Sequence, residues 1–183
     1  MKKNSSRILI SATSSNVGKT LFTSSLLEVL KFANTHSFKC GPDYIDPMFH
    51  RGVLGVESHN LDLFLADADK VKMLFHKYSM GYGAAVCEGV MGYYDGLGGT
   101  TDHGSSWHVA HTLNLPVLLV LRPKGSSLTL AVQVKGLCAF REDHRIAGIL
   151  LNDCSPMLFQ SLAPMLERET GIPVLGYLPY MEE

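Results

Sequence analysis

The sequence predicts an α/β fold with an open, mainly parallel sheet covered by helices on both faces. Short apolar runs alternate with longer segments in which apolar residues recur every three or four positions. The least interrupted apolar runs lie at 84–88, 116–121 and 145–151, and such runs are typical of parallel strands buried on both faces. With 46% hydrophobic and 18% charged residues, the 183 residues suffice for the core of one ordinary domain.

The individual elements follow from the same patterns. The last helix has the clearest ends, with Ser155 as N-cap, Pro156 in the first turn and Gly171 just past the last turn. The Gly-rich stretch 89–104 is predicted to be a functional loop, because it is longer than an ordinary connection. We expect strands at 7–11, 38–40, 84–88, 116–121, 145–151 and 173–177, and helices at 20–33, 67–78, 105–114, 126–140 and 156–170.

Charge and hydropathy exclude several classes of partner. The net charge of −1 offers no basic footprint for nucleic acid or for an acidic membrane surface. No apolar run reaches the roughly 18 residues of a membrane span, and the apolar stretch near the start is too short for a signal peptide. The four cysteines form no CxxC pair and are predicted to be buried free thiols. We therefore expect a cytoplasmic protein without a nucleic-acid or membrane partner.

A phosphate-binding loop is predicted between the first strand and the first helix. There the segment TSSNVGKT offers backbone N–H groups and a helix N-terminus, which together favour bound phosphate. Lys19 suits the outer phosphates and the Thr20 hydroxyl suits Mg²⁺, although Thr13 stands where the strict pattern has glycine. The alternative is a plain strand–turn–helix with a solvated lysine. The predicted ATP contacts in this P-loop NTPase-like fold are Thr13, Ser14, Ser15, Asn16, Val17, Gly18, Lys19 and Thr20, with Thr23 one turn further on.

Four acidic residues follow predicted strands or lie in the Gly-rich loop. Asp43 and Asp46 stand three residues apart between prolines, Glu88 ends an apolar strand, and Asp95 precedes a glycine. The carboxyl ends of parallel strands face the ligand crevice. Acids beside a polyphosphate need cations between them, so the group predicts Mg²⁺-assisted phosphoryl transfer. Ordinary Asp-rich and Asp-Gly turns are the alternative interpretation.

Four segments carry a more specific resemblance: KCGPDYIDPMFH (39–50), HNLD (59–62), CEGVMGYYDG (87–96) and PVLGYLP (173–179). They resemble the marker segments of the cobyrinic acid a,c-diamide synthase family, whose synthetase domain is similar to dethiobiotin synthetase, a P-loop fold. The resemblance covers nearly all of residues 1–183 but only the N-terminal synthetase domain of the family's usual protein. We expect residues 1–183 to lack the family's C-terminal glutamine amidotransferase domain. The chain departs from the family pattern at Ala12, Ser14, His59 and Arg122.

The resemblance implies a reaction and a set of site residues. It implies ATP- and Mg²⁺-dependent amidation of the side-chain carboxylates of a tetrapyrrole (corrinoid) acid through an acyl phosphate. Ammonia would come from a glutaminase domain or subunit. The implied catalytic residues are Lys19, Asp43, Asp46, Glu88 and Asp95; the metal ligands are Thr20, Asp46 and Glu88; the substrate contacts are Lys39, Tyr44 and Ile45; and the adenine contacts are Asn152 and Pro179.

Three alternatives stay open at this point. One is a related P-loop carboxylate ligase with another substrate. Another is a regulatory or partitioning ATPase that works by nucleotide-dependent dimerisation; such proteins carry a second lysine early in the loop, where this chain has Ser14. The third is a non-catalytic fragment that keeps only the fold. A possible homodimer is compatible with each of them.

Overall fold

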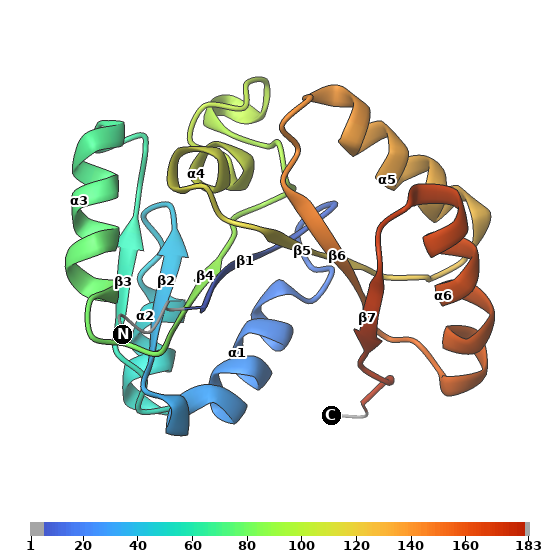
Figure 1. Cartoon of the computed structure of the whole chain (residues 1–183), viewed down its shortest axis with the longest axis horizontal. Helices are drawn as coiled ribbons and strands as arrows, with labels where there is room; N and C mark the ends of the chain where they lie inside the picture. The colour runs from blue at the N-terminus through green and yellow to red at the C-terminus, as the bar shows by residue number, and fades with distance from the viewer. Residues whose placement is uncertain (1–5, 182–183) are drawn as a thin grey trace.

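The computed structural model describes residues 6–181, and these form one sheet of seven strands in which every pairing is parallel. The strand order is β3-β2-β4-β1-β5-β6-β7, so the first strand lies at the centre (Figure 1). This confirms the predicted open parallel sheet. The strands are β1 (Ser6–Ala12), β2 (Thr35–Cys40), β3 (Ser58–Leu61), β4 (Ala84–Glu88), β5 (Val117–Leu121), β6 (Ile146–Leu151) and β7 (Val174–Tyr177).

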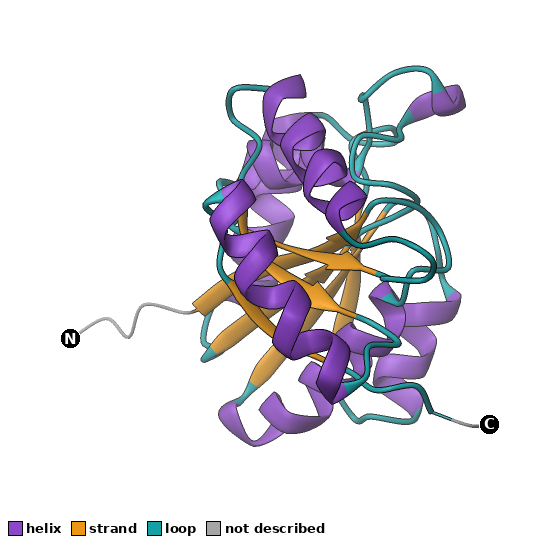
Figure 2. Cartoon of the chain, turned by 90° about the vertical axis from the view of Figure 1, so that its right-hand side faces the viewer, coloured by secondary structure: helices purple, strands orange, loops and turns teal. Residues whose placement is uncertain are grey.

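Helices cover both faces of this sheet, as Figure 2 shows. None of the helices in residues 6–181 is both long and apolar enough to cross a bilayer. The α-helices are α1 (Lys19–Leu30), α2 (Ile45–Gly52), α3 (Ala68–Ser79), α4 (Ser106–Leu113), α5 (Leu128–Phe140) and α6 (Pro156–Thr170), and two short 3₁₀ helices are η1 (Lys31–Ala33) and η2 (Leu97–Gly99).

Two hydrophobic clusters, one on each face, follow from the alternation of side chains along the strands. On β1, Leu9 belongs to the larger cluster, to which α3, α4, α5 and α6 contribute. Its neighbour Ile10 belongs to the smaller cluster, which contains Phe22 and Leu27 of α1. Successive side chains of a strand point to opposite faces. The α1 face is therefore also the face on which even-numbered residues of β4, including Glu88, lie.

The structure differs from the sequence prediction around residues 31–61. The first α-helix ends at Leu30, and residues 31–33 form η1 rather than a further α-helical turn. The strand predicted at 38–40 begins at Thr35, and α2 and β3 were not predicted at all. The prolines near Asp46 suggested a restrained turn, but Pro47 lies in the first turn of α2. A proline is tolerated there because that N–H has no intrahelical partner.

Candidate active site

The phosphate loop, residues 13–18, connects β1 to α1 and is fixed to the end of β6. The Asn152 side-chain amide donates to the Val17 carbonyl at 2.9 Å. Gly18 has φ 116°, and a Cβ there would lie 2.3 Å from Nδ2 of Asn152. The left-handed conformation and the lack of space both require glycine. Asn152, predicted to contact adenine, therefore also holds the loop in position.

Lys19 lies in the first turn of α1 with its ammonium group held by carbonyl oxygens. Its Nζ donates to the carbonyls of Ser14 at 3.0 Å and Met91 at 2.6 Å. Burial lowers the pKa of Lys19, and the charge of Lys39 lowers it further, while Glu88 and Asp95 act in the opposite direction. A buried cation at a helix N-terminus gains from an anionic ligand. This is the environment that a bound phosphate would complete.

Strand register places the second lysine of the site directly beside its acid. Lys39 on β2 is the registered partner of Glu88 on β4. The Lys39 ammonium lies 2.9 Å from Oε1 of Glu88, 2.5 Å from Oδ2 of Asp46 and 3.8 Å from Oδ2 of Asp43. The Thr20 hydroxyl donates to the same Oε1 of Glu88 at 2.6 Å. We call these five residues the acid–lysine cluster.

The charges of the acid–lysine cluster depend on one another. Burial would lower the pKa of Lys39, but the Glu88 carboxylate and the hydrogen bond to Asp46 outweigh it, so the pKa is raised. Burial works to raise the pKa of Asp46, but its bond to Lys39 prevails and lowers it. Burial raises the pKa of Glu88 despite the nearby ammonium. The acids outnumber the cation, so a further cation would be favourable here.

One oxygen of Glu88 is left over. Oε2 is buried and has no hydrogen-bond partner among residues 6–181, and Nε2 of His50 lies 3.8 Å from it. His50 is fully buried on α2 and its Nδ1 lies 2.9 Å from the Ser37 hydroxyl. The sequence patterns gave His50 no part in the predicted metal site. His50 follows Asp46 by four residues, so the two side chains share one face of α2. A prediction of this helix would have placed His50 near the acids.

The donor set fits Mg²⁺ in chemistry. Thr20, Asp46 and Glu88 offer only oxygen atoms, which this ion prefers, and the unpaired Oε2 of Glu88 would gain a partner. No group of three or more His, Cys, Asp or Glu side chains within residues 6–181 is arranged to hold a metal ion by itself. This agrees with the position of the Lys39 ammonium between the acids. Phosphate oxygens and water would have to supply the remaining ligands.

The other predicted site residues lie outside the acid–lysine cluster. Asp95 accepts a hydrogen bond from Gly92 N at 3.0 Å, and a Cβ on Gly92 would lie 2.8 Å from the Thr13 carbonyl, so the Gly-rich loop packs on the phosphate loop. Tyr44 and Ile45 are 70% and 66% exposed at the start of α2. Thr23 is buried within α1, its hydroxyl unbonded among the described residues, and Pro179 is exposed beyond β7. Among residues 6–181, no side-chain hydrogen bond joins Thr23 or Pro179 to the acid–lysine cluster.

The fold and the loop define a P-loop NTPase-like fold class. The solved structure of chloroplast FtsY from Physcomitrella patens matches all of this chain with a TM-score of 0.69, 15% identity and 61% coverage of that protein. A ParA family ATPase from Chlorobium tepidum matches 97% of this chain and 85% of its own, with a TM-score of 0.60 and 12% identity. Likenesses at such low identity show the fold alone.

Sequence comparison is more specific. The chain is 43% identical over 171 residues to cobyrinate a,c-diamide synthase of Gloeobacter violaceus, covering 92% of this chain and 38% of the relative. It is 42% identical over 179 residues to the enzyme of that name from Clostridium acetobutylicum, covering 96% and 40%. No protein-family model matches the chain. The chain is thus a homologue of cobyrinate a,c-diamide synthases over nearly its whole length, as the marker segments predicted, and spans about two fifths of theirs.

Proposed function

We propose that this chain is the ATP-dependent, carboxylate-activating part of a ligase that amidates side-chain carboxylates of a corrinoid acid. The observation that carries the proposal is the acid–lysine cluster beside Lys19, in which Thr20, in the first turn of α1 after the phosphate loop, bonds directly to Glu88. The cluster lies beside the predicted triphosphate site. The chain is also a homologue of cobyrinate a,c-diamide synthases. That combination favours phosphoryl transfer to a carboxylate over simple anion binding.

The reaction would proceed in two steps. A carboxylate oxygen of the substrate attacks the γ-phosphorus of ATP, the bond to ADP breaks, and an acyl phosphate forms. Ammonia then attacks the acyl carbon and the C–O bond to phosphate breaks; the amide keeps two hydrogens of ammonia and phosphate carries away the third. Lys19 and Lys39 would offset the charge of the transferring group, which is the main electrostatic task in such reactions.

The remaining roles follow from position. Thr20, Asp46 and Glu88 would hold Mg²⁺, which when bound neutralises polyphosphate charge. Asp43, at the edge of the acid–lysine cluster, or Asp95, on the Gly-rich loop, would orient or deprotonate ammonium. The exposed Tyr44 and Ile45 would contact the substrate, and Asn152 and Pro179 would lie near adenine. Ammonia would come from a glutaminase domain or partner subunit, and the named relatives are longer than this chain.

The test is a nucleotide assay on the chain with cobyrinate as substrate and an ammonium salt as nitrogen source. Steady-state ADP formation should require Mg-ATP, cobyrinate and ammonium together, because without ammonium the reaction stops at the acyl phosphate, and Lys19→Met should abolish it. Cobyrinate labelled with ¹⁸O in its carboxylates should transfer the label to the released phosphate. Unlabelled phosphate would reject the acyl phosphate. ADP formation driven by a different acid would show a related ligase with another substrate.

A further inference from the structure

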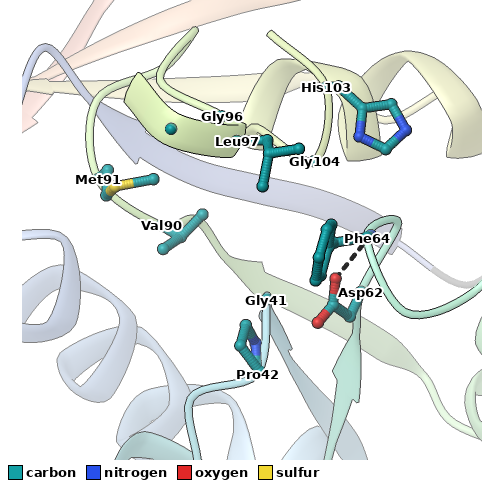
Figure 3. A pocket seen from close by; sticks show the side chains of 11 residues that line it. Gly41, Pro42, Asp62, Phe64, Val90, Met91, Gly96, Leu97, His103 and Gly104 are labelled. Carbon is teal, nitrogen blue, oxygen red and sulfur yellow. Dashed lines mark hydrogen bonds between the residues drawn. The ribbon is translucent and has the colours of Figure 1, made fainter. Parts of the chain in front are cut away.

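A cavity of about 250 Å³ adjoins the acid–lysine cluster and has no part in the roles assigned so far. It lies between the turn after β2, the end of β3 and the Gly-rich loop (Figure 3). Gly41 on its wall is two residues beyond Lys39, and Val90 is two residues beyond Glu88. The cavity therefore lies close to the cluster, although none of the five cluster residues lines it. Most of its lining side chains are apolar, among them Phe64 and Leu97.

Asp62 is the only ionisable carboxyl group among the residues that line this cavity. Its Oδ1 accepts hydrogen bonds from Phe64 N at 2.8 Å and Leu65 N at 3.4 Å, which fixes the turn after β3. Its Oδ2 is buried and lacks a hydrogen-bond partner among residues 6–181. Figure 3 shows the carboxylate between Phe64 and the Gly41–Pro42 turn. A buried acceptor without a donor is costly, so a ligand that donates to Oδ2 would be bound favourably.

The chemistry of the wall narrows the class of ligand. A carboxylate oxygen accepts hydrogen bonds, so the ligand must offer N–H or O–H. Beside apolar side chains and the His103 imidazole, one free carboxylate oxygen does not suit Mg²⁺, which needs several oxygen ligands. An ionised carboxylate of the substrate would be repelled by Asp62. A small cation with N–H donors meets all three conditions.

We propose that Asp62 binds ammonium, the nitrogen co-substrate, in this cavity. The inference rests on the proposed function, because the proposed amide-forming step is what consumes ammonia. Met91 links the two sites, since it lines the cavity and its carbonyl holds the Lys19 ammonium. Ammonium bound at Asp62 would therefore be separated from the γ-phosphoryl group of ATP by Met91. The apolar lining leaves room for an edge of the substrate, which would exclude water from the bound ammonium.

The experiment measures ADP formation against ammonium chloride concentration, with Mg-ATP and cobyrinate saturating. Asp62→Asn keeps an oxygen for the Phe64 and Leu65 amides but replaces the free oxygen by an N–H donor. The ammonium concentration for half-maximal rate should rise about tenfold, which corresponds to about 1.4 kcal/mol. Those for Mg-ATP and cobyrinate should not change. Leu97→Trp, at a rim position that is 52% exposed, should narrow the mouth and shift the ammonium dependence in the same direction.

The matched control is Asp67→Asn. Asp67 also caps a backbone N–H, that of Lys70, but it lies at the start of α3 away from the cavity lining. This variant should keep the parental ammonium dependence. Retained Mg-ATP affinity shows that Asp62→Asn is folded, and if that affinity is lost, Leu97→Trp decides.

Two results would overturn the ammonium site while the proposed function stands. One is an Asp62→Asn protein that is active and keeps the parental ammonium dependence. If that variant has lost its affinity for Mg-ATP, the same result for Leu97→Trp counts instead. The other is a shift in the cobyrinate requirement instead, which would place a substrate arm in the cavity. If the unaltered chain forms no ADP with cobyrinate and ammonium, the proposed function fails and the ammonium site fails with it.

Discussion

At the residue scale, Lys39 is the side chain on which the resting state of the site depends. Its ammonium is the cation that contacts both Asp46 and Glu88 within residues 6–181, and it is almost completely buried. Removing one partner of a buried ion group leaves the others uncompensated in a medium of low dielectric constant. Lys39 therefore stabilises the fold when no nucleotide is bound, in addition to any contact with substrate.

Lys39→Met should lower the free energy of unfolding by about 3 kcal/mol, because Asp46 and Glu88 lose their buried counter-charge. Urea denaturation at pH 7 measures this. The double variant Lys39→Met/Glu88→Gln should recover part of the loss, since the buried acid is then neutral. A single variant as stable as the parent would show that the acids take up protons or water without cost.

Glu88→Gln should reduce the rate of ADP formation by about 10²-fold or more, because the carboxylate bonded to Thr20 is replaced by a neutral group. The measurement is the rate of ADP formation as Mg²⁺ is varied at fixed ATP. Glu57→Gln, an exposed substitution just before β3, is the control and should leave the rate unchanged. A Glu88→Gln protein with parental Mg²⁺ dependence would remove Glu88 from the metal site.

Sequence reasoning reached the identities of these residues but not their pairings. The GKT pattern marks Lys19 and Thr20, and a carboxylate at a strand tip marks Glu88. That Lys39 lies beside Glu88 depends on the register of β2 with β4, which no local pattern encodes. The cavity at Asp62 depends on β3, a strand that the patterns did not predict. The unpaired oxygen of Asp62 can be recognised only in the folded structure, where three separate segments form the cavity.

At the element scale, α6 is the helix whose ends the sequence specifies most completely. The Ser155 hydroxyl accepts from Leu158 N at 3.2 Å, and Gly171 ends the helix with φ 71°. Ser155→Ala should cost about 1 kcal/mol of unfolding free energy, because an N–H of the first turn loses its acceptor. Thermal or urea denaturation measures the loss. Ser161→Ala, in the exposed middle of the same helix, should be neutral or slightly stabilising.

The elements that were missed have weak local signals. α2 is only eight residues long, and the residue before a proline disfavours helical conformation, as Asp46 does before Pro47. β3 has the sequence SHNL, which lacks apolar alternation, and it pairs only with β2 at the edge of the sheet. Both elements are stabilised by tertiary packing, with α2 lying against β2 and β3. Local propensity alone could not have found them.

The pairing of β2 with β3 predicts a pH dependence. Nε2 of His36 lies 3.0 Å from Nδ1 of His59, and burial, followed by the charge of His59, lowers the pKa of His36 to about 4 from 6.5. The unfolded chain therefore binds the proton more readily than the folded chain. The stability that neutral His36 contributes is fully present above pH 6.5 and is lost as the pH falls towards 4. The loss is about 3 kcal/mol at most.

The comparison of His36→Gln with the parent tests this sign. Urea denaturation from pH 7 to pH 4 should show a smaller loss of unfolding free energy in the variant, because glutamine takes up no proton. His76→Gln, exposed on α3, is the control and should follow the parent. An equal loss of stability in parent and His36→Gln would assign acid sensitivity to other groups.

At the scale of the whole molecule, strand–helix alternation predicted the open parallel sheet, but not the order of its strands. The order places β1 between β4 and β5, so the phosphate loop, Glu88 and the end of β5 meet at the carboxyl end of the sheet. Crossovers of this kind are right-handed and put ligands at the carboxyl ends of the strands. The general location of the site followed from this rule, whereas the cavity beside it needed the folded Gly-rich loop.

Nucleotide binding should stabilise the whole domain, since the phosphate loop is tied to β6 through Asn152 and to the Gly-rich loop through Lys19. A ligand that binds only the folded state at 100 times its dissociation constant adds about 2.7 kcal/mol. Mg-ATP should therefore raise the midpoint of thermal unfolding by several degrees, and EDTA should reverse much of the rise. Lys19→Met should remove the response, whereas Lys72→Met, on an exposed turn of α3, should keep it. An unaltered midpoint for the parent at millimolar Mg-ATP would contradict a triphosphate site at the start of α1.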